Sequence, residues 1–274
     1  MPATALMNLF AELHYALRRH WPYYLTEAAG LAVFVTCSSL LTLALEHPDS
    51  PLHQWLMAQG AGPTLRRVPL GVGMGLVIVI LTYNPWGKRS GAHINPAITL
   101  AFWQLGRIRR ADALWYGLAQ LAGGVSTTVL LKALLMPYYA HPSFHFGTTR
   151  PGPDGAGVAF AIEFVISFGL MLVLLLALRS ARFKKVAGWL VGALLVVYVI
   201  WESPYSGMSL NPFRSLASAV AAGELDHIWV YLLAPPAAMW LAARLFQLFF
   251  WHPRSGSADA DAEELPRYPD PDAA

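Results

Sequence analysis

The sequence predicts an all-α membrane protein with six transmembrane helices and two re-entrant half-helices, arranged as an inverted repeat. Its 274 residues are 56% hydrophobic and only 13% charged, with a mean hydropathy of +0.45, which is too apolar for a water-soluble domain of this size. The apolar runs are long and unbroken rather than alternating, which favours helices over a transmembrane barrel. The phrase Ser-Gly-x-x-x-Asn-Pro occurs twice, at residues 90–96 and 206–212.

Both copies of this motif are expected at membrane depth, as a loop followed by a half-helix. Each copy follows a long apolar run, at 70–83 or 186–201, and precedes an apolar piece, at 97–106 or 213–222, that is too short to span a bilayer. Asn can cap a helix with its side chain, and Pro at the first helical position sacrifices no hydrogen bond, because that N–H has no helical partner. The two half-helices are therefore expected to begin near the midplane with their N-terminal ends facing each other.

The first half of the chain supplies three predicted spans, at about 22–45, 68–84 and 111–135. Residues 1–21 are predicted to be a cytoplasmic segment with a short interfacial helix, because Leu and Phe recur there at helical spacing up to a basic end. The first half-helix lies between the second and third spans, after a break at 84–89 that contains Asn, Pro and Gly.

The second half repeats this plan with spans at about 157–178, 186–201 and 227–250. Its half-helix again lies between the last two spans. Residues 252–274 are rich in Pro and acidic residues, and they are predicted to form a disordered cytoplasmic tail.

An odd number of spans in each repeat forces the two halves into opposite orientations. Glu27 then corresponds to Glu163, and Asn95 to Asn211. The distribution of Lys and Arg places both termini in the cytoplasm, because basic residues concentrate on the inner side of membrane proteins. Five of the nineteen basic residues fall toward the outside: Arg66, Arg67, Lys132, Arg150 and Arg214.

The same sequence argues against a nucleic-acid partner, an intrachain disulfide and a cleaved signal peptide. Basic residues lie between the spans rather than on one face, so the net charge of +3 does not indicate a nucleic-acid partner. The single cysteine, Cys37, cannot form an intrachain disulfide. The first long apolar run follows Arg18-Arg19 and lacks a clear small-x-small cleavage site, so the N-terminus is expected to be retained rather than removed as a signal peptide.

The two motifs resemble the signatures of the aquaporin and glycerol-facilitator (major intrinsic protein) family. Residues 90–97 are similar to the first signature, and residues 211–215 to the second, which is usually Asn-Pro-Ala-Arg. A lone Asn-Pro marks many turns, but two copies in equivalent places of six spans are a specific signal. The resemblance implies an aquaporin-like channel domain at 22–251, with repeats of about 22–136 and 157–251. It also implies a homotetramer in a bacterial inner membrane.

A pore for neutral solutes needs hydrogen-bond donors, an apolar wall and a barrier to cations. Asn95 and Asn211 are expected to present their amides to the lumen, while the half-helix N-termini place positive potential at its centre. A purely capping role of both asparagines is the alternative, and it is compatible with exposure to the lumen. The remaining residues of the two motifs are Pro96, Ala97, Pro212 and Phe213.

A selectivity filter is predicted around Arg214, because an arginine at membrane depth is costly unless it lines water. The alternative is an interfacial arginine that reaches the lipid head groups. The resemblance adds Met74, Val199 and Met208 to the filter, with Gly75 in place of Met74 if the break at 84–89 holds no inserted residue.

This filter lacks the aromatic residue and the histidine that water-selective members usually place on spans two and five. The resemblance therefore implies a wider and more apolar filter that passes water and also glycerol, urea, peroxide or neutral metalloid hydroxides. Against glycerol, Ser215 stands where glycerol facilitators generally carry Asp.

The sequence leaves more than one role open for four further residues: Glu27, Glu163, His93 and Phe213. Glu27 and Glu163 are expected to accept hydrogen bonds from the backbone of the re-entrant loops, with a proton relay as the alternative. His93 is expected to line the inner half of the pore by resemblance, with a gating or pH role as the alternative. Phe213 replaces an Ala where the two motifs meet, so its ring narrows the midpoint, shifts the half-helix or packs into the bundle.

The sequence therefore predicts a passive channel for water and small neutral solutes, with no cofactor and no metal. A secondary transporter is the first rival, because inverted repeats and broken helices also occur in that class. A non-conducting structural membrane protein is the second. An enzyme is disfavoured, because no nucleophile with a paired base and no metal-ligand spacing is found.

Overall fold

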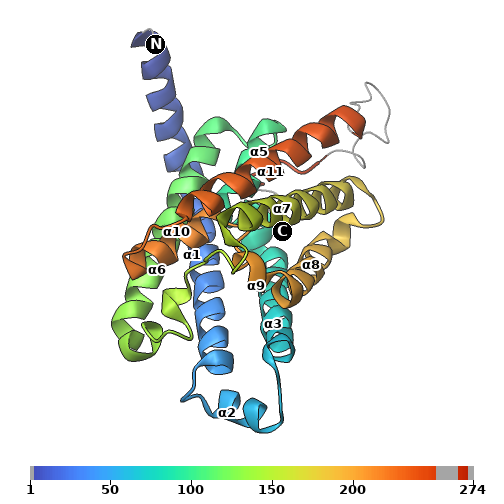
Figure 1. Ribbon diagram of the computed structural model, residues 1–274. Coiled ribbons are helices and arrows are strands. Elements are labelled where there is room, and N and C mark those ends of the chain that lie inside the picture. The colour runs from blue at the N-terminus through green and yellow to red at the C-terminus, as the bar shows by residue number, and fades with distance from the viewer. Residues whose placement is uncertain (1–2, 251–264, 271–274) are drawn as a thin grey trace.

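Six helices of the computed structural model, which describes residues 3–250 and 265–270, are long and apolar enough to cross a membrane. They form one bundle with the short helices between them (Figure 1). The predicted architecture of six spans is confirmed. The spanning helices are α1 (Ala3–Glu46), α3 (Pro63–Tyr83), α6 (Arg110–Tyr139), α7 (Gly155–Arg179), α8 (Ala187–Trp201) and α11 (Ile228–Phe249).

The two predicted half-helices are α5 (Pro96–Gln104) and α10 (Pro212–Ala222). Each follows a shorter helix, α4 (Pro85–Ser90), which the sequence indicated only as a break, or α9 (Ser203–Ser206). Outside the repeat plan lie α2 (Pro51–Ala58) and two short 3₁₀ turns, η1 (His145–Gly147) and η2 (Lys184–Val186).

Asparagine followed by proline starts three of these short helices, for the local reason that the sequence suggested. The side chain of Asn84 accepts a hydrogen bond of 2.8 Å from the Gly87 N–H at the start of α4. Asn95 and Asn211 cap α5 and α10 in the same way. Proline has the opposite effect late in α6, where Leu135 leaves helical geometry two residues before Pro137.

The N-terminal segment differs from its prediction, because residues 3–46 form one continuous helix rather than an interfacial helix followed by a span. Pro22 removes one backbone hydrogen bond inside α1. Two contacts with α6 keep the turns of α1 before Pro22 continuous with the rest of the helix. The Arg110 Nε donates to Glu12 at 2.7 Å, and the Trp115 indole donates to the Leu13 carbonyl at 3.0 Å.

The C-terminal tail also differs from its prediction where it is described. Residues 265–270 pack against the bundle, with Leu265 only 3% exposed, so disorder does not describe them. In a tail that is otherwise acidic and Pro-rich, Leu265 is buried and the Tyr268 ring is partly buried against the main apolar cluster, and this burial favours docking. The rest of the predicted tail, 252–264 and 271–274, lies outside the described residues.

Paired glycines set the distance between α3 and α8, which lie side by side in Figure 1. A Cβ at Gly75 would lie 2.7 Å from the Gly192 carbonyl oxygen, and a Cβ at Gly192 would lie 2.8 Å from the Gly75 carbonyl oxygen. Both distances are too short for a side chain, so the crossing requires glycine from both repeats. The two central helices can therefore line one cavity.

We predict that Gly75→Ala lowers the free energy of unfolding by about 1–3 kcal/mol, because the new methyl group meets backbone atoms that cannot rotate away. Thermal unfolding of the detergent-solubilised protein measures this change. The matched control is Gly157→Ala in α7, since a Cβ there meets no described atom within 4 Å. Equal melting temperatures of the two variants would contradict the close crossing.

Candidate functional site

The first re-entrant loop is held by a single buried carboxylate from α1. One oxygen of Glu27 accepts hydrogen bonds from the Ser90 hydroxyl at 2.9 Å and the His93 N–H at 3.0 Å. The other oxygen accepts the Ile94 N–H at 2.6 Å. Glu27 is fully buried, so these backbone groups have no access to bulk water. The carboxylate gives them the partners that an apolar surround would otherwise deny.

The second loop repeats this arrangement with Glu163 from α7. Its carboxylate accepts hydrogen bonds from the Ser206 hydroxyl at 2.7 Å, the Ser209 N–H at 2.6 Å and the Leu210 N–H at 2.9 Å. A tyrosine closes each loop from the following span of its own repeat. The Tyr116 hydroxyl donates to the Ser90 carbonyl at 2.8 Å, and the Tyr231 hydroxyl donates to the Ser206 carbonyl at 2.7 Å.

Both loops reach this geometry through the left-handed region of backbone space. Ala92 and Ile94 have φ of 46° and 52°, and their counterparts Met208 and Leu210 have φ of 49° and 56°. Each such non-glycine residue costs about 1–2 kcal/mol. The strain persists because it turns successive N–H groups toward one carboxylate.

The two asparagines lock the half-helices to each other at the centre. The Asn95 amide donates to the Leu210 carbonyl at 2.7 Å, and the Asn211 amide donates to the Ile94 carbonyl at 2.8 Å. Their side-chain oxygens accept N–H groups from the first turns of α5 and α10, at 2.9 Å and 3.1 Å. A carboxamide nitrogen carries two protons, so one N–H of each asparagine remains for a ligand in the cavity beside them.

That cavity has a volume of about 270 Å³ and runs past both asparagines. It extends from His93 to the segment around η1, and it is lined by helices of both repeats. All four residues predicted for the filter line it, together with apolar side chains of α3, α7 and α8. These four residues are Met74, Val199, Met208 and Arg214.

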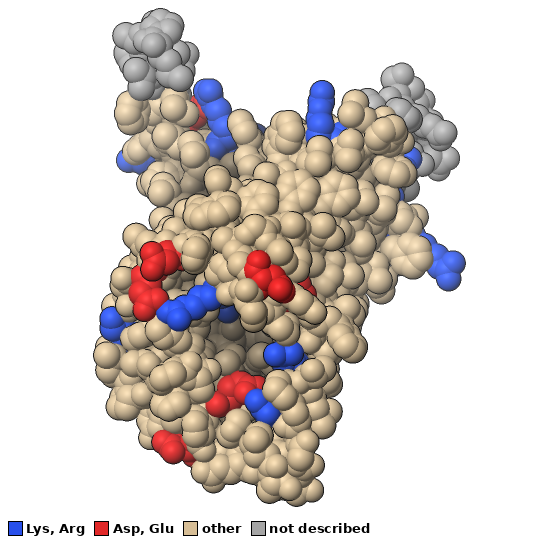
Figure 2. Space-filling view, viewed as in Figure 1, with Lys and Arg blue, Asp and Glu red and all other residues tan. Residues whose placement is uncertain are grey.

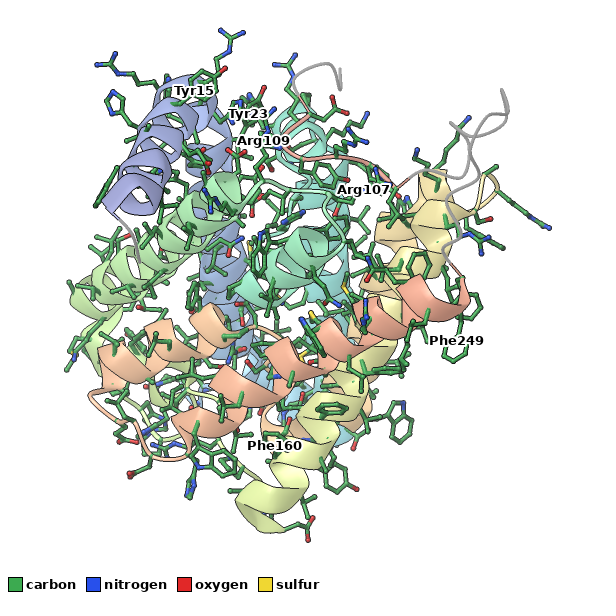
Figure 3. All side chains as sticks on the ribbon, turned by 90° about the horizontal axis from the view of Figure 1, so that it is seen from above. Tyr15, Tyr23, Arg107, Arg109, Phe160 and Phe249 are labelled. Carbon is green, nitrogen blue, oxygen red and sulfur yellow. The ribbon has the colours of Figure 1, made fainter. Side chains whose placement is uncertain are left out.

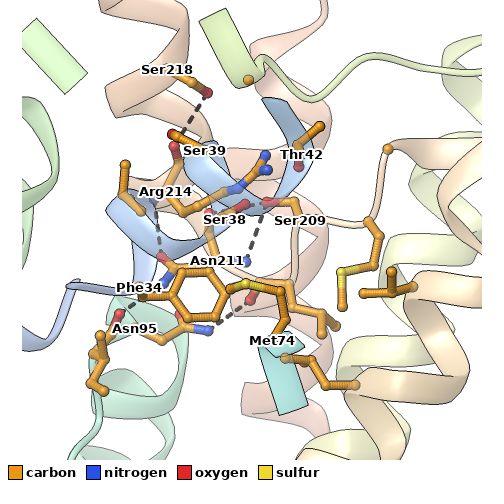
Figure 4. A pocket seen from close by; sticks show the side chains of 18 of the residues that line it. Phe34, Ser38, Ser39, Thr42, Met74, Asn95, Ser209, Asn211, Arg214 and Ser218 are labelled. Carbon is orange, nitrogen blue, oxygen red and sulfur yellow. Dashed lines mark hydrogen bonds between the residues drawn. The ribbon is translucent and has the colours of Figure 1, made fainter. Parts of the chain in front are cut away.

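Hydroxyl groups from α1 line the same cavity, and the sequence reasoning missed them. In Figure 4, the labelled side chains around Arg214 include Ser38 and Thr42, whereas Phe34 and Met74 lie toward the asparagines. A signal for these residues was present in the sequence. Positions 34, 38 and 42 follow Glu27 at helical spacing, so polar residues there share its inward face.

Arg214 lies at the second half-helix, where its backbone N–H donates to the Asn211 side chain at 3.2 Å. One terminal nitrogen of its guanidinium, Nη1, is buried without a hydrogen-bond partner among the described residues. A buried, unpaired donor is expensive unless water or a solute satisfies it. The arginine therefore offers a donor to the cavity.

His93 lies at the opposite end of the cavity and is 3% exposed. Its Nδ1 lies 3.1 Å from the Thr99 hydroxyl, while its Nε2 is buried and has no protein partner among the described residues. The hydrogen bond to Thr99 fixes the ring orientation, as expected for a histidine with a structural partner.

The Phe213 ring does not line the cavity. It faces α6, where a Cβ built on Gly117 would lie 3.7 Å from its Cε2 atom, and it packs with an apolar cluster that includes Leu31 and Val35. Of the three alternatives left by the sequence, packing into the bundle is the one observed. Because glycine has no side chain, position 117 leaves the space that the Phe213 ring occupies.

The face that carries α2 and η1 is hollowed, with acidic and basic side chains around the hollow (Figure 2). Ion pairs on this face include Arg66 with Glu46, at 2.8 Å, and Arg150 with Glu224. A hydrogen bond from His145, aided by the Arg150 charge, holds the pKa of the Glu224 carboxyl below its ordinary value. These two pairs bring oppositely charged side chains together on this face.

Comparison with known proteins agrees with this geometry. The family described as major intrinsic protein matches the chain over residues 18–246, which includes both re-entrant loops and both buried glutamates. The chain belongs to the major intrinsic protein family. It is thus an integral, multi-pass membrane protein of a family of channels.

Relatives within this family come from plants and bacteria. The chain is 37% identical to Aquaporin NIP1-3 of Oryza sativa subsp. japonica over 177 residues, which are 64% of this chain and 59% of that protein. The match therefore spans less than two thirds of that relative's length. Glycerol uptake facilitator protein-like 6 of Lactiplantibacillus plantarum is 34% identical, over 64% of this chain and 81% of that protein.

A solved structure has the same fold. The X-ray structure of the aquaglyceroporin from Plasmodium falciparum superposes with a TM-score of 0.66, over 83% of this chain and 96% of that chain. Sequence identity is 20%, so this likeness establishes the arrangement of the helices and nothing about the solute.

We predict that Glu27→Gln impairs folding more than it alters selectivity. A carboxamide has one acceptor oxygen, so at least one of the two buried backbone N–H groups is left unpaired, at a cost of about 1–3 kcal/mol. The yield of monodisperse protein and its melting temperature measure this effect. Glu12→Gln is the control, because its carboxylate pairs with Arg110 at the surface. A stable Glu27→Gln protein with changed selectivity would assign the carboxylate to solute selection instead.

We also predict that Phe213→Ala leaves the unit permeability unchanged and lowers stability by about 0.5–3 kcal/mol, since the ring packs between helices. Osmotic flux at matched protein density measures the permeability. Val199→Ala is the comparison, because it enlarges the lined cavity and is expected to raise glycerol flux. An increase in flux with Phe213→Ala would show that the ring restricts the pore.

Proposed function

We propose that this protein is a passive channel for water and small neutral solutes. The observation that carries the proposal is the single cavity that brings both asparagines and the four filter residues together. The cavity needs no moving part to connect these groups. Family membership supports the same function.

The proposed mechanism replaces the hydrogen bonds of water one by one along the cavity. A solute accepts hydrogen bonds from Arg214 and then from the free N–H groups of Asn95 and Asn211, while apolar side chains form the opposite wall. The N-termini of α5 and α10 add positive potential at the asparagines. This potential repels protons and other cations, so the channel admits neutral molecules and excludes cations.

The proposed solutes include small polyols and neutral hydroxides in addition to water. Met74, Val199 and Met208 offer no hydrogen bonds to hold a file of water molecules, and they leave an apolar face for a carbon backbone. The hydroxyls of Ser38 and Thr42 offer donors and acceptors to hydroxylated solutes on the side of Arg214.

The proposed topology puts both termini in the cytoplasm. All but five of the nineteen Lys and Arg residues then lie on the inner side, which supports this orientation. Membership of a channel family and the relative from Lactiplantibacillus plantarum support a homotetrameric protein of a bacterial inner membrane that has no enzymatic activity.

Stopped-flow light scattering of proteoliposomes tests the proposal directly. Shrinkage in an impermeant osmolyte reports water flux, and re-swelling in glycerol reports solute flux. We expect both to exceed the rates of empty liposomes. Water flux alone would restrict the proposal to a water channel, whereas dependence of solute flux on a proton or sodium gradient would favour a secondary transporter. Absence of any flux above empty liposomes would overturn the channel function.

We predict that Arg214→Val increases leakage of larger neutral solutes and of ions. The substitution removes the positive charge and the donors from the cavity and shortens the side chain. Fluxes of glycerol, a larger sugar alcohol and a permeant ion are compared in the same vesicles. Arg67→Val is the control, because it removes a charge predicted on the same side but does not touch the cavity. Unchanged selectivity of Arg214→Val would remove this arginine from the filter.

A further inference from the structure

The C-terminal segment at residues 265–270 lies across the turn that leads into α6. The Tyr268 N–H donates to the Arg107 carbonyl at 2.7 Å, and the Asp270 N–H donates to the Arg89 carbonyl at 2.7 Å. Tyr268 also forms an isolated parallel β-bridge with Ile108. In Figure 3, which looks onto this face, the segment passes beside the labelled Arg107. The segment is therefore held to the bundle by backbone hydrogen bonds at Tyr268 and at Asp270.

The side chain of Tyr268 is inserted at the inner end of the pore. Its ring lies 5.2 Å from the His93 ring, edge to face, and 5.6 Å from the Phe102 ring. It also lies flat over Gly91, where an added Cβ would come within 2.7 Å of two ring carbons. The tyrosine ring thus packs against the re-entrant loop at Gly91 and His93.

The ring of Tyr268 lies next to the His93 end of the cavity. His93 lines the cavity, whereas Phe102 and Tyr268, two of the rings that pack against it, do not. The Nε2 atom of His93 is buried on this side and has no hydrogen-bond partner among the described residues. In a pore open at both ends, a lining histidine would be in contact with water on its inner side. Here three rings surround it, the third being that of Tyr116.

We infer that the inner mouth of the channel is a binding site for residues 265–270 of the chain itself, and that insertion of Tyr268 closes the pore. The inference rests on the proposed function, since closure has meaning only if the pore conducts. The inner mouth is the end of the cavity at His93, on the face where α3 ends and α6 begins.

The contacts are suited to reversible docking. The segment adds no helix or sheet to the bundle, and its Tyr268 and Asp270 N–H groups donate to the carbonyls of Arg107 and Arg89. Because it is tethered to α11, its effective concentration at the mouth is high even though the contact is small. Local release of such a segment leaves the rest of the fold intact.

The first test compares the osmotic water permeability of the full-length protein with that of Tyr268→Ala and Tyr268→Phe. If about a tenth of the channels are open when the segment is free to dock, removing the ring raises the mean permeability about tenfold. Tyr268→Phe keeps the ring and is expected to match the natural protein. Equal and measurable flux in all three proteins would overturn the inference and leave the channel function standing. Flux in none of them, at the level of empty liposomes, would overturn both.

A second test measures docking without relying on a difference in flux between single variants. Arg89 and Asp270 are replaced by cysteine in a Cys37→Ser background, because their backbones lie one hydrogen bond apart in the docked segment. We expect oxidation to form an intrachain disulfide and lower the permeability, and reduction to restore it. The same pair combined with Tyr268→Ala is expected to form the disulfide without losing permeability. Failure of the cysteines to pair, or equal closure with and without the ring, would overturn the role of Tyr268.

Discussion

The structure depends on pairing the backbone N–H groups of two loops that enter an apolar environment. Neither loop has a helix or sheet to satisfy these groups, and unpaired amides at membrane depth are too expensive to persist. Glu27 and Glu163 solve this problem from within neighbouring spans, each by accepting two consecutive backbone N–H groups and one hydroxyl. A carboxylate is suited to this role because its two oxygens accept several hydrogen bonds in one plane.

Everything at the centre of the pore follows from that pairing. Once the loops are fixed, Asn95 and Asn211 begin their half-helices opposite each other and bond to the partner loop. The repeat is nevertheless chemically unequal: His93 corresponds to Ser209, and Ala97 to Phe213. The polar frame is thus shared by both halves, while the side chains beyond it place a histidine at one end of the cavity and hydroxyls and a positive charge at the other.

The fold was accessible from the sequence because its signals are local. Asn-Pro marks the start of each half-helix, and span length follows from unbroken apolar runs. What the sequence could not indicate depends on contacts between distant segments. The direction of the Phe213 ring is set by the space beside Gly117, and the Tyr268 ring packs against Gly91, where a Cβ would clash with it. The α1 hydroxyls of Ser38 and Thr42 are an intermediate case. They were not predicted from the sequence, although their helical spacing from Glu27 places them on the same inward face of α1.

Hydrogen exchange of the two re-entrant loops, in lipid nanodiscs, tests the central role of the carboxylates most directly. The amides of Ile94 and Leu210 lie outside any helix, so an unpaired loop would exchange them as fast as an exposed turn. Our account predicts protection close to that of the flanking spans, because each amide is buried and bonded to a carboxylate. Exchange at the rate of the connecting segment at 148–154 would contradict it.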